Sequence, residues 1–516
     1  MKSSALVRIR AAIPALIFLL LATATATAQQ AAPKPSEFPP GKLSRLEDLP
    51  AGRFRNRVTS LPAPARAHAY EVLRRFHFTE LDLNSLETDP DGGVYYVDHF
   101  GPLASPAMQT AAASGPVTAA ASVPATPFPS GLVFHSRPGS ANRIFLNFTG
   151  KTVTGTAWNS SLGRSSIPAV AFSLDSDFTT FSDAEQQAIK YVWLRVAEDY
   201  APFDVDVTTE PPGTLTATTA EALITRNTDN DGNANPSSTA GGVAYVSVFG
   251  SGSYGNYRPA WIYYNNLANA ESYIAEAASH EIGHNLGLSH DGKTDGTEYY
   301  SGHGSGDISW GPIMGTGYNR NVSQWSKGDY YLANNTQDDL ATIAAHLGYR
   351  EDDRGDTIAS ASPLVVTGGT NIVSTRPDTD PWNAHPENKG VLEQTADVDV
   401  FSFSTGTGSV RLSVNPWLMP SGTRGGNLDV LLELHDSGGA LMATNNVATA
   451  TGATIQTNLA SGHYYLFVRS TGTGDPMSST PSGYTVYASR GQYFISGSIA
   501  PGAAPAAPAN FRVISN

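Results

Sequence analysis

The chain contains the stretch His280-Glu281-Ile282-Gly283-His284-Asn285-Leu286-Gly287-Leu288-Ser289-His290. Residues four apart lie on one face of a helix, so His280 and His284 can direct their imidazoles at the same metal ion. Gly287 stands where a helix would end in a left-handed residue, and the turn after it can bring His290 back as a third ligand. Three protein ligands with one open position are typical of a catalytic zinc site, whereas structural sites are closed by four.

The carboxylate of Glu281 lies one step round the helix from these histidines. We expect it to accept a proton from a water molecule that Zn²⁺ activates, without binding the metal itself. The short motif HExxH is a weak signal alone, because two histidines also occur on solvated helix faces. The correctly spaced glycine and third histidine make the longer motif much more specific.

A second motif follows and reads Gly311-Pro312-Ile313-Met314-Gly315-Thr316-Gly317-Tyr318. Met314 lies 24 positions after His290 (314 minus 290). The two motifs together resemble those of metzincin zinc endopeptidases, in which a turn containing a methionine lies beneath the metal. The resemblance covers about residues 131–350. His290 followed by Asp291 is most similar to the adamalysin (reprolysin) family.

This resemblance implies an α/β catalytic domain, with a mixed twisted sheet and an active-site helix at about residues 270–286. It also implies that the substrates are polypeptides, and that residues 243–249 form the sheet edge where unpaired backbone groups bind an extended peptide. Some other metzincins have a zinc-binding tyrosine two residues after the methionine, but Thr316 stands there, so no tyrosine ligand is expected. Hydrophobic periodicity and capping residues predict a strand at 143–148, a helix at 184–200 after Ser182 or Asp183, and strands at 203–207 and 241–249.

Residues 1–28 read as a secretory signal peptide. Basic residues precede an apolar run over residues 11–22, and Ala26-Thr27-Ala28 is a typical cleavage site. The apolar run is too short to be a membrane span. We therefore expect a secreted protein without a membrane span.

Residues 29–100 are predicted to be a pro-segment that covers the cleft until it is removed, which would make the chain a zymogen. A helix is expected at 63–76 and a strand at 93–97. The chain has no cysteine, so a blocking ligand would have to come from a carboxylate or an imidazole, with candidates Asp89, Asp91, Asp98 and His99. A simple N-terminal folding module is an equally good interpretation. Residues 101–130, rich in Ala, Ser, Thr and Pro, are predicted to be a linker and a processing site.

From about residue 357 to 498, short alternating strands recur between turns, which indicates an all-β sandwich domain. Residues 397–403, 428–430 and 461–465 resemble a bacterial pre-peptidase C-terminal domain. Such domains accompany secreted proteases. Residues 499–516 look like a linker or the shortened start of a fibronectin type III module.

The 516-residue chain has a net charge of −14. This charge argues against nucleic-acid binding, which needs basic patches. Two acidic stretches could bind Ca²⁺, residues 229–233 and 351–356, but a surface turn is the more ordinary interpretation of the first and a charged hinge is a common interpretation of the second. We expect a monomer.

Two functions fit these observations: a secreted zinc endopeptidase, or a secreted binding or adhesive protein built on an inactive peptidase scaffold. The complete set of His280, His284, His290 and Glu281 favours the enzyme, because an inactive scaffold would usually have lost one of them. His303, between the third histidine and Met314, could compete as a ligand, although a solvated loop histidine is the more ordinary interpretation.

Overall fold

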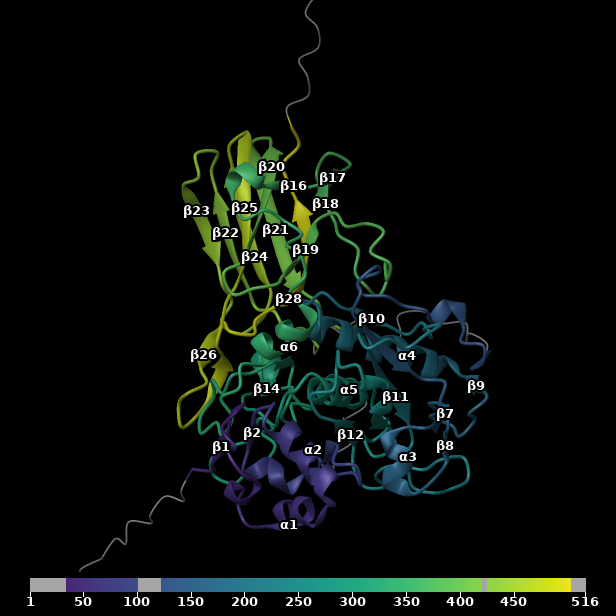
Figure 1. Cartoon of the computed structure of the whole chain (residues 1–516). Coiled ribbons are helices and arrows are strands. Elements are labelled where there is room, and N and C mark those ends of the chain that lie inside the picture. Colours follow the sequence, from purple (N-terminus) through teal and green to yellow (C-terminus); the bar gives the residue numbers. More distant parts are fainter. Residues whose placement is uncertain (1–33, 101–121, 420–424, 503–516) are drawn as a thin grey trace, which may run out of the picture. The chain divides into compact units, whose positions relative to one another are not determined.

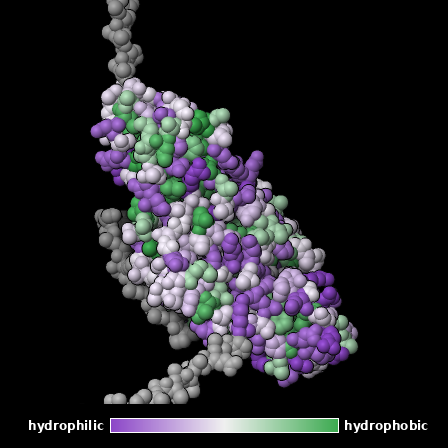
Figure 2. All heavy atoms as spheres, turned by 90° about the vertical axis from the view of Figure 1, so that its left-hand side faces the viewer, coloured by the Kyte–Doolittle hydropathy of each residue, from purple (hydrophilic) through white to green (hydrophobic). Residues whose placement is uncertain are grey.

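The computed structural model describes residues 34–100, 122–419 and 425–502 (Figure 1). The predicted signal peptide, residues 101–121 of the predicted linker, and residues 503–516 lie outside these ranges. Within them, no helix is both long and apolar enough to cross a bilayer. On the face shown in Figure 2, hydrophobic residues are mixed with hydrophilic ones.

A seven-stranded mixed sheet forms the centre of the region that carries the histidine motif. Its strand order is β10-β6-β11-β13-β12-β4-β3. The first four strands pair in parallel, and β12 then pairs antiparallel with β13. The strands are β3 (Leu86–Thr88), β4 (Val94–Asp98), β6 (Arg143–Asn147), β10 (Asp206–Thr208), β11 (Thr219–Thr225), β12 (Gly242–Tyr245) and β13 (Ala260–Tyr263).

Two helices, α4 (Asp183–Asp199) and α5 (Glu271–Asn285), pack on each other and on this sheet. Helix α4 begins after Ser182, one of the two caps expected from the sequence, and Ser182 forms a capping box with Glu185. Helix α5 buries 13 of its 15 residues, so the histidine motif lies inside the molecule. Shorter elements of this region are α3 (Ala157–Leu162), α6 (Asp339–Leu347), β5 (Val123–Pro124), β7 (Lys151–Thr154), β8 (Ser166–Ala169), β9 (Thr180–Phe181), β14 (Trp310–Pro312) and β15 (Val322–Gln324).

Two predicted strands are shorter than expected. Only Asp206 and Val207 of the 203–207 segment join the ladder, because the backbone of Phe203 bridges to Tyr349 instead. The 241–249 strand ends at Tyr245. Beyond it, the N–H groups of Ser247 and Val248 turn toward the last carbonyls of α5, where they cap this helix.

Residues 34–100 form a small folded region that joins the central sheet. It contains β1 (Glu37–Phe38), α1 (Arg53–Ser60), α2 (Ala63–Leu73) and β2 (Phe78–Thr79), followed by the β3–β4 hairpin. Its side chains form a hydrophobic core that also includes Val246, the residue after β12. The predicted helix at 63–76 and strand at 93–97 are confirmed. However, β4 pairs with β12, so the expectation that residues 243–249 form a free sheet edge is wrong for this state of the chain.

The part from Ser362 to Ser498 is all-β and consists of two main sheets around one hydrophobic core. The first sheet has the order β16-β20-β25-β22-β23 and the second β17-β18-β28-β21-β24, with β19 also paired to β28. The strands are β16 (Ser362–Pro363), β17 (Val366–Thr367), β18 (Asn371–Ile372), β19 (Lys389–Leu392), β20 (Val398–Thr405), β21 (Gly408–Pro416), β22 (Val430–His435), β23 (Leu441–Asn445), β24 (Ala453–Leu459), β25 (Gly462–Ser470), β26 (Thr473–Asp475), β27 (Ser482–Tyr484) and β28 (Gly491–Ser498).

Candidate metal centre

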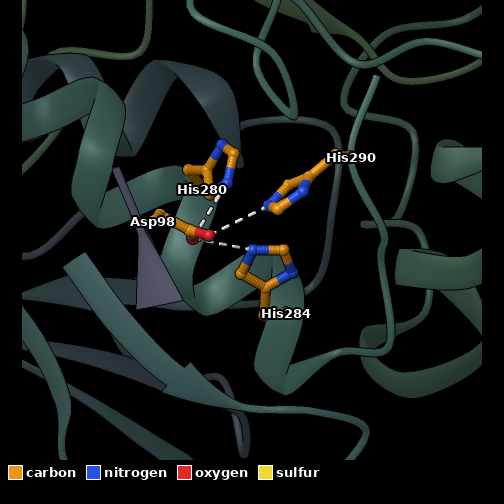
Figure 3. Close-up of side chains that lie close together, drawn as sticks. All are labelled: Asp98, His280, His284 and His290. Carbon is orange, nitrogen blue, oxygen red and sulfur yellow. Dashed lines mark hydrogen bonds and ion pairs between the residues drawn. The ribbon is translucent and has the colours of Figure 1, made fainter. Parts of the chain in front are cut away.

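The structure brings three imidazoles together at one buried point (Figure 3). His280 and His284 project from adjacent turns of α5, with ring centroids 4.7 Å apart. Gly287, at φ +96°, ends this segment in the left-handed region expected from the sequence. The reversed chain returns His290, whose ring lies 5.3 Å from His280 and 5.0 Å from His284.

Each of the three rings is held through its Nδ1 atom. A ring that donates a hydrogen bond through Nδ1 presents a lone pair at Nε2, the form that binds metals. The Nδ1 partners are Ile313 O at 2.9 Å for His280, Leu288 O at 2.8 Å for His284, and Asp82 Oδ1 at 3.2 Å for His290.

The three Nε2 atoms all face the carboxylate of Asp98, at the end of β4 (Figure 3). Its Oδ2 lies 3.3 Å from His280 Nε2 and 3.1 Å from His284 Nε2, and its Oδ1 lies 3.1 Å from His290 Nε2. Burial by itself would raise the pKa of Asp98, but the three histidines hold it well below its usual value. One atom from each of the four side chains lies within 4.8 Å of the others.

This arrangement fits a metal cation. Three imidazole lone pairs and a carboxylate directed at one point repel each other unless positive charge lies between them. The Nε2 atoms of His280 and His290 are buried without a hydrogen-bond partner, as are both carboxylate oxygens of Glu281. A donor set of three histidine nitrogens and one carboxylate oxygen suits Zn²⁺.

Glu281 lies in a tight space on α5 against β12. A Cβ atom added to Gly242 would come within 1.9 Å of the Glu281 Oε1 atom, so only glycine leaves room for this carboxylate. Burial, followed by the negative charge of Asp98, raises the pKa of Glu281 well above its usual value. The carboxylate is therefore confined beside the histidines.

Met314 is fully buried beneath the histidine helix. An added Cβ at Gly283, between the first two histidines, would lie 2.7 Å from the Met314 sulfur. The same turn holds both ends of the histidine motif, since Ile313 O binds His280 and Met314 O accepts the N–H of Asp291 at 2.8 Å. The turn thus supports the site through its backbone and through packing.

Of the four candidate blocking residues, the structure places only Asp98 on the histidines. Asp89 closes a turn and accepts a hydrogen bond from the Tyr245 hydroxyl at 2.9 Å. Asp91 and His99 are exposed. The difference follows from strand geometry, because side chains alternate between the two faces of β4 and only one register brings a carboxylate to the site.

Sequence reasoning missed three residues at the site. The Tyr299 hydroxyl donates to Asp98 Oδ1 at 3.1 Å. The ring of Tyr96 stacks on His284 with centroids 3.9 Å apart. Asp82, besides holding His290, accepts a hydrogen bond from the Tyr96 hydroxyl at 3.0 Å. Of these three residues, only Tyr96 lies in an element predicted from the sequence, the strand at 93–97. It stands two residues before Asp98, so the two side chains share a face of an extended backbone.

The expectation of a solvated loop for His303 is wrong. Its side chain is buried, with Nδ1 2.8 Å from the Tyr300 hydroxyl and Nε2 2.7 Å from Gly483 O. Both ring nitrogens are therefore engaged away from the metal centre. The 229–233 stretch forms a turn in which Asp229 accepts the N–H groups of Asp231 and Asn233 and pairs with Arg164.

Residues 208–326 match the Reprolysin_5 family model, which describes metallo-peptidase family M12. This range contains the three histidines, Glu281 and Met314, so the chain carries a metallopeptidase domain of this family. A comparison with curated proteins finds no match.

Two solved structures resemble part of the chain. One is the pre-peptidase C-terminal domain of the collagenase from Bacillus anthracis, at 17% identity and a TM-score of 0.17, covering 28% of this chain and 99% of that one. The other is PliG from Aeromonas hydrophila, a periplasmic inhibitor of g-type lysozyme, at 14% identity and a TM-score of 0.16, covering 27% of this chain and 95% of that one.

Proposed function

We propose that this chain is a secreted zinc-dependent endopeptidase of the metzincin type that is made as a latent precursor. The observation that carries the proposal is the convergence of three Nε2 lone pairs beside the confined carboxylate of Glu281. The family match over residues 208–326 supports a metallopeptidase with polypeptide substrates. We further propose that the enzyme acts as a monomer.

In this proposal His280, His284 and His290 hold Zn²⁺. When bound, the metal supplies polarisation of the scissile carbonyl and acidifies the attacking water. Glu281 accepts the proton of that water and returns it to the leaving amine. Met314 packs against the helix, and the carbonyls of Ile313 and Leu288 accept hydrogen bonds from the Nδ1 atoms of His280 and His284, which keeps these two imidazoles in place. Backbone groups of β12 bind an extended peptide by strand addition once that strand is free.

The Glu281→Ala variant tests the assignment. It should keep one zinc ion per chain, measured by elemental analysis, while casein or gelatin hydrolysis falls by several orders of magnitude. In the wild type, a chelator should abolish hydrolysis and added zinc should restore it. Full hydrolysis by Glu281→Ala with free zinc removed would contradict the assignment. Zinc binding without any hydrolysis by the processed wild type would favour the binding or adhesive scaffold instead.

We propose that residues 34–100 keep the enzyme latent, because they occupy both the substrate-binding strand β12 and the three-histidine metal site. Strand β4 lies antiparallel along β12, with Asp98 opposite Gly242 and Tyr95 opposite Tyr245. It therefore takes the backbone hydrogen bonds that an extended substrate would use. Its last residue fills the fourth position around the three histidines.

The covering strand does not present its own peptide bond for hydrolysis. The Asp98 carbonyl accepts the Gly241 N–H at 2.8 Å, so it is directed at β12 while the side chain faces the histidines. Asp82 and Tyr96 come from the same region and contact His290 and His284. Removal of residues 34–100 would thus free the metal and the substrate strand together.

A pair of alanine variants tests the role of Asp98, with Asp91→Ala as the matched control because Asp91 is exposed and has no contact with the histidines. Removing one partner from a buried charge pair costs about 3–5 kcal/mol. This loss should weaken the binding of residues 34–100 over the metal site by a factor of about 100 or more. The test is made in the Glu281→Ala background, where self-digestion cannot occur.

The readouts do not depend on activity. Cobalt replaces zinc, and its visible absorption reports the number and type of ligands. Asp98→Ala should change this spectrum and make residues 34–100 sensitive to trypsin, whereas Asp91→Ala should change neither. Identical spectra and identical digestion of the two variants would refute latency through Asp98 and leave the zinc assignment untouched.

A further inference from the structure

Phe100 lies two residues after Asp98 and contacts the metal site as well. An extended backbone directs alternate side chains to one face, and three side chains on this face of the chain meet the histidines. Tyr96 stacks on His284, and Asp98 faces the Nε2 atoms. The Phe100 ring then meets the His280 ring edge to face, with centroids 5.4 Å apart. The covering chain therefore continues past the metal site.

A recess lined by aromatic and apolar groups receives the Phe100 ring. Two tyrosine rings meet it edge to face, Tyr299 with centroids 5.6 Å apart and Tyr318 with centroids 5.3 Å apart. A Cβ atom added to Gly241 would come within 2.5 Å of the Phe100 ring and 3.0 Å of the Leu267 side chain. The ring can lie against the backbone here only because Gly241 has no side chain. The recess is thus formed by Gly241, Leu267, Tyr299 and Tyr318.

The recess lies on the path that we propose for an extended substrate. Strand β4 runs antiparallel to β12 up to Gly242, and the Gly241 N–H donates to the Asp98 carbonyl at 2.8 Å. Phe100 follows directly after this last backbone bond. A peptide added to β12 in the same direction would place a side chain in the recess just after the residue over the metal. That side chain belongs to the half of the substrate that carries the leaving amine.

The charges near the recess are negative. Burial, followed by the negative charges of Glu276, Glu281 and Asp98, raises the pKa of Tyr318 well above its usual value. Glu276 and Glu281 belong to α5, so they stay when the covering chain is removed. An acidic substrate side chain would be repelled at this position, whereas an aromatic ring can make the same edge-to-face contacts as Phe100.

We infer that Gly241 determines the specificity of the processed enzyme, which selects an aromatic side chain at the first or second residue after the scissile bond. In the precursor, Phe100 fills this recess in place of the substrate. The inference rests on the proposed endopeptidase function and adds the class of side chain that it recognises. Burial of an aromatic ring in place of a methyl group should raise kcat/KM by about 10–100-fold.

The first experiment maps by mass spectrometry where the processed wild type cuts casein. Phe, Tyr and Trp should be enriched at the two positions after the cut. Two fluorogenic peptides that differ only by Phe or Ala at the enriched position should then differ in kcat/KM by about 10–100-fold. Gly241→Ala should reduce this ratio to below about threefold, because its Cβ takes the space of the ring. Gly213→Ala, whose Cβ meets no atom within 4 Å, should keep the wild-type ratio.

The second experiment uses the full precursor with Glu281→Ala and needs no peptide hydrolysis by this chain. Phe100→Ala should let trypsin digest residues 34–100 several-fold faster, whereas His99→Ala, at an exposed neighbour, should not. Equal digestion of the two variants would overturn the inference. Casein cleavage without aromatic enrichment, or an unchanged peptide ratio in Gly241→Ala, would also overturn it and leave the endopeptidase standing. A processed wild type that cuts nothing would refute the proposed function and this inference together.

Discussion

The narrow space between β12 and α5 makes Gly242→Ala a sensitive probe of Glu281. The new Cβ would lie 1.9 Å from the Glu281 Oε1 atom, 2.4 Å from its Cδ and 2.6 Å from its Cγ. Ordinary contacts between such atoms begin at about 3.4 Å, so the carboxylate has to move by about 1.5 Å. Neither backbone can yield easily, because β12 stays paired with β13 after β4 is removed, and α5 is almost completely buried.

The displacement should reduce catalysis much more than metal binding. A misplacement of about 1 Å in a catalytic group can cost about 100-fold in rate, so kcat/KM of the processed enzyme should fall by about 100-fold or more. Overpacking should also lower the free energy of unfolding by about 1–3 kcal/mol. The three atoms nearest the added Cβ all belong to Glu281 and none to the histidines, so the zinc content should stay at one ion per chain.

The assay compares kcat/KM on a fluorogenic peptide, zinc content and Tm. Gly213→Ala is the matched control, since a Cβ there meets no atom within 4 Å and the residue does not have a positive φ. This control should behave as the wild type. A Gly242→Ala enzyme with kcat/KM within threefold of wild type (about 0.7 kcal/mol in the barrier) would refute the inference that Glu281 works from this confined position.

Three further outcomes are expected. Met314→Leu nearly conserves volume, so it should cost less than about 1.5 kcal/mol of unfolding free energy in a denaturant titration. If the free energy of unfolding fell by as much as it does when a substitution leaves a cavity, the sulfur would have a more specific role. Tyr299→Phe removes a hydrogen bond to Asp98, and should speed self-processing of the precursor by several-fold in a timed gel assay; an unchanged rate would show that this bond does not contribute to latency. Burial raises the pKa of Glu198 from 4.5 to about 8, so the stability that its neutral form contributes is complete below pH 4.5 and is lost as the pH rises toward 8. The Tm should therefore fall over this pH range, and it should fall less in Glu198→Gln. Curves of Tm against pH that run parallel for the two proteins would count against the assignment.

The spacing of residues in the sequence determined the local parts of this site. His280 and His284 share a helix face because of the helical repeat, and Gly287 can adopt the φ of +96° that the turn requires. The helix over Asp183–Asp199 follows from its capping box and its apolar positions. These features depend on neighbours within a few residues, so one sequence suffices to predict them.

Only the tertiary structure decided which acid meets the histidines. Asp89, Asp91 and Asp98 have the same side chain, and His99 could also bind a metal, so the choice among the four depends on the register of β4 against β12, about 150 residues later in the chain. A slip of one residue would turn Asp98 to the opposite face. The contacts of Asp82 and Tyr299 and the burial of His303 have the same origin. Each joins segments that are distant in sequence, and no local pattern of charge or hydrophobicity records such a contact.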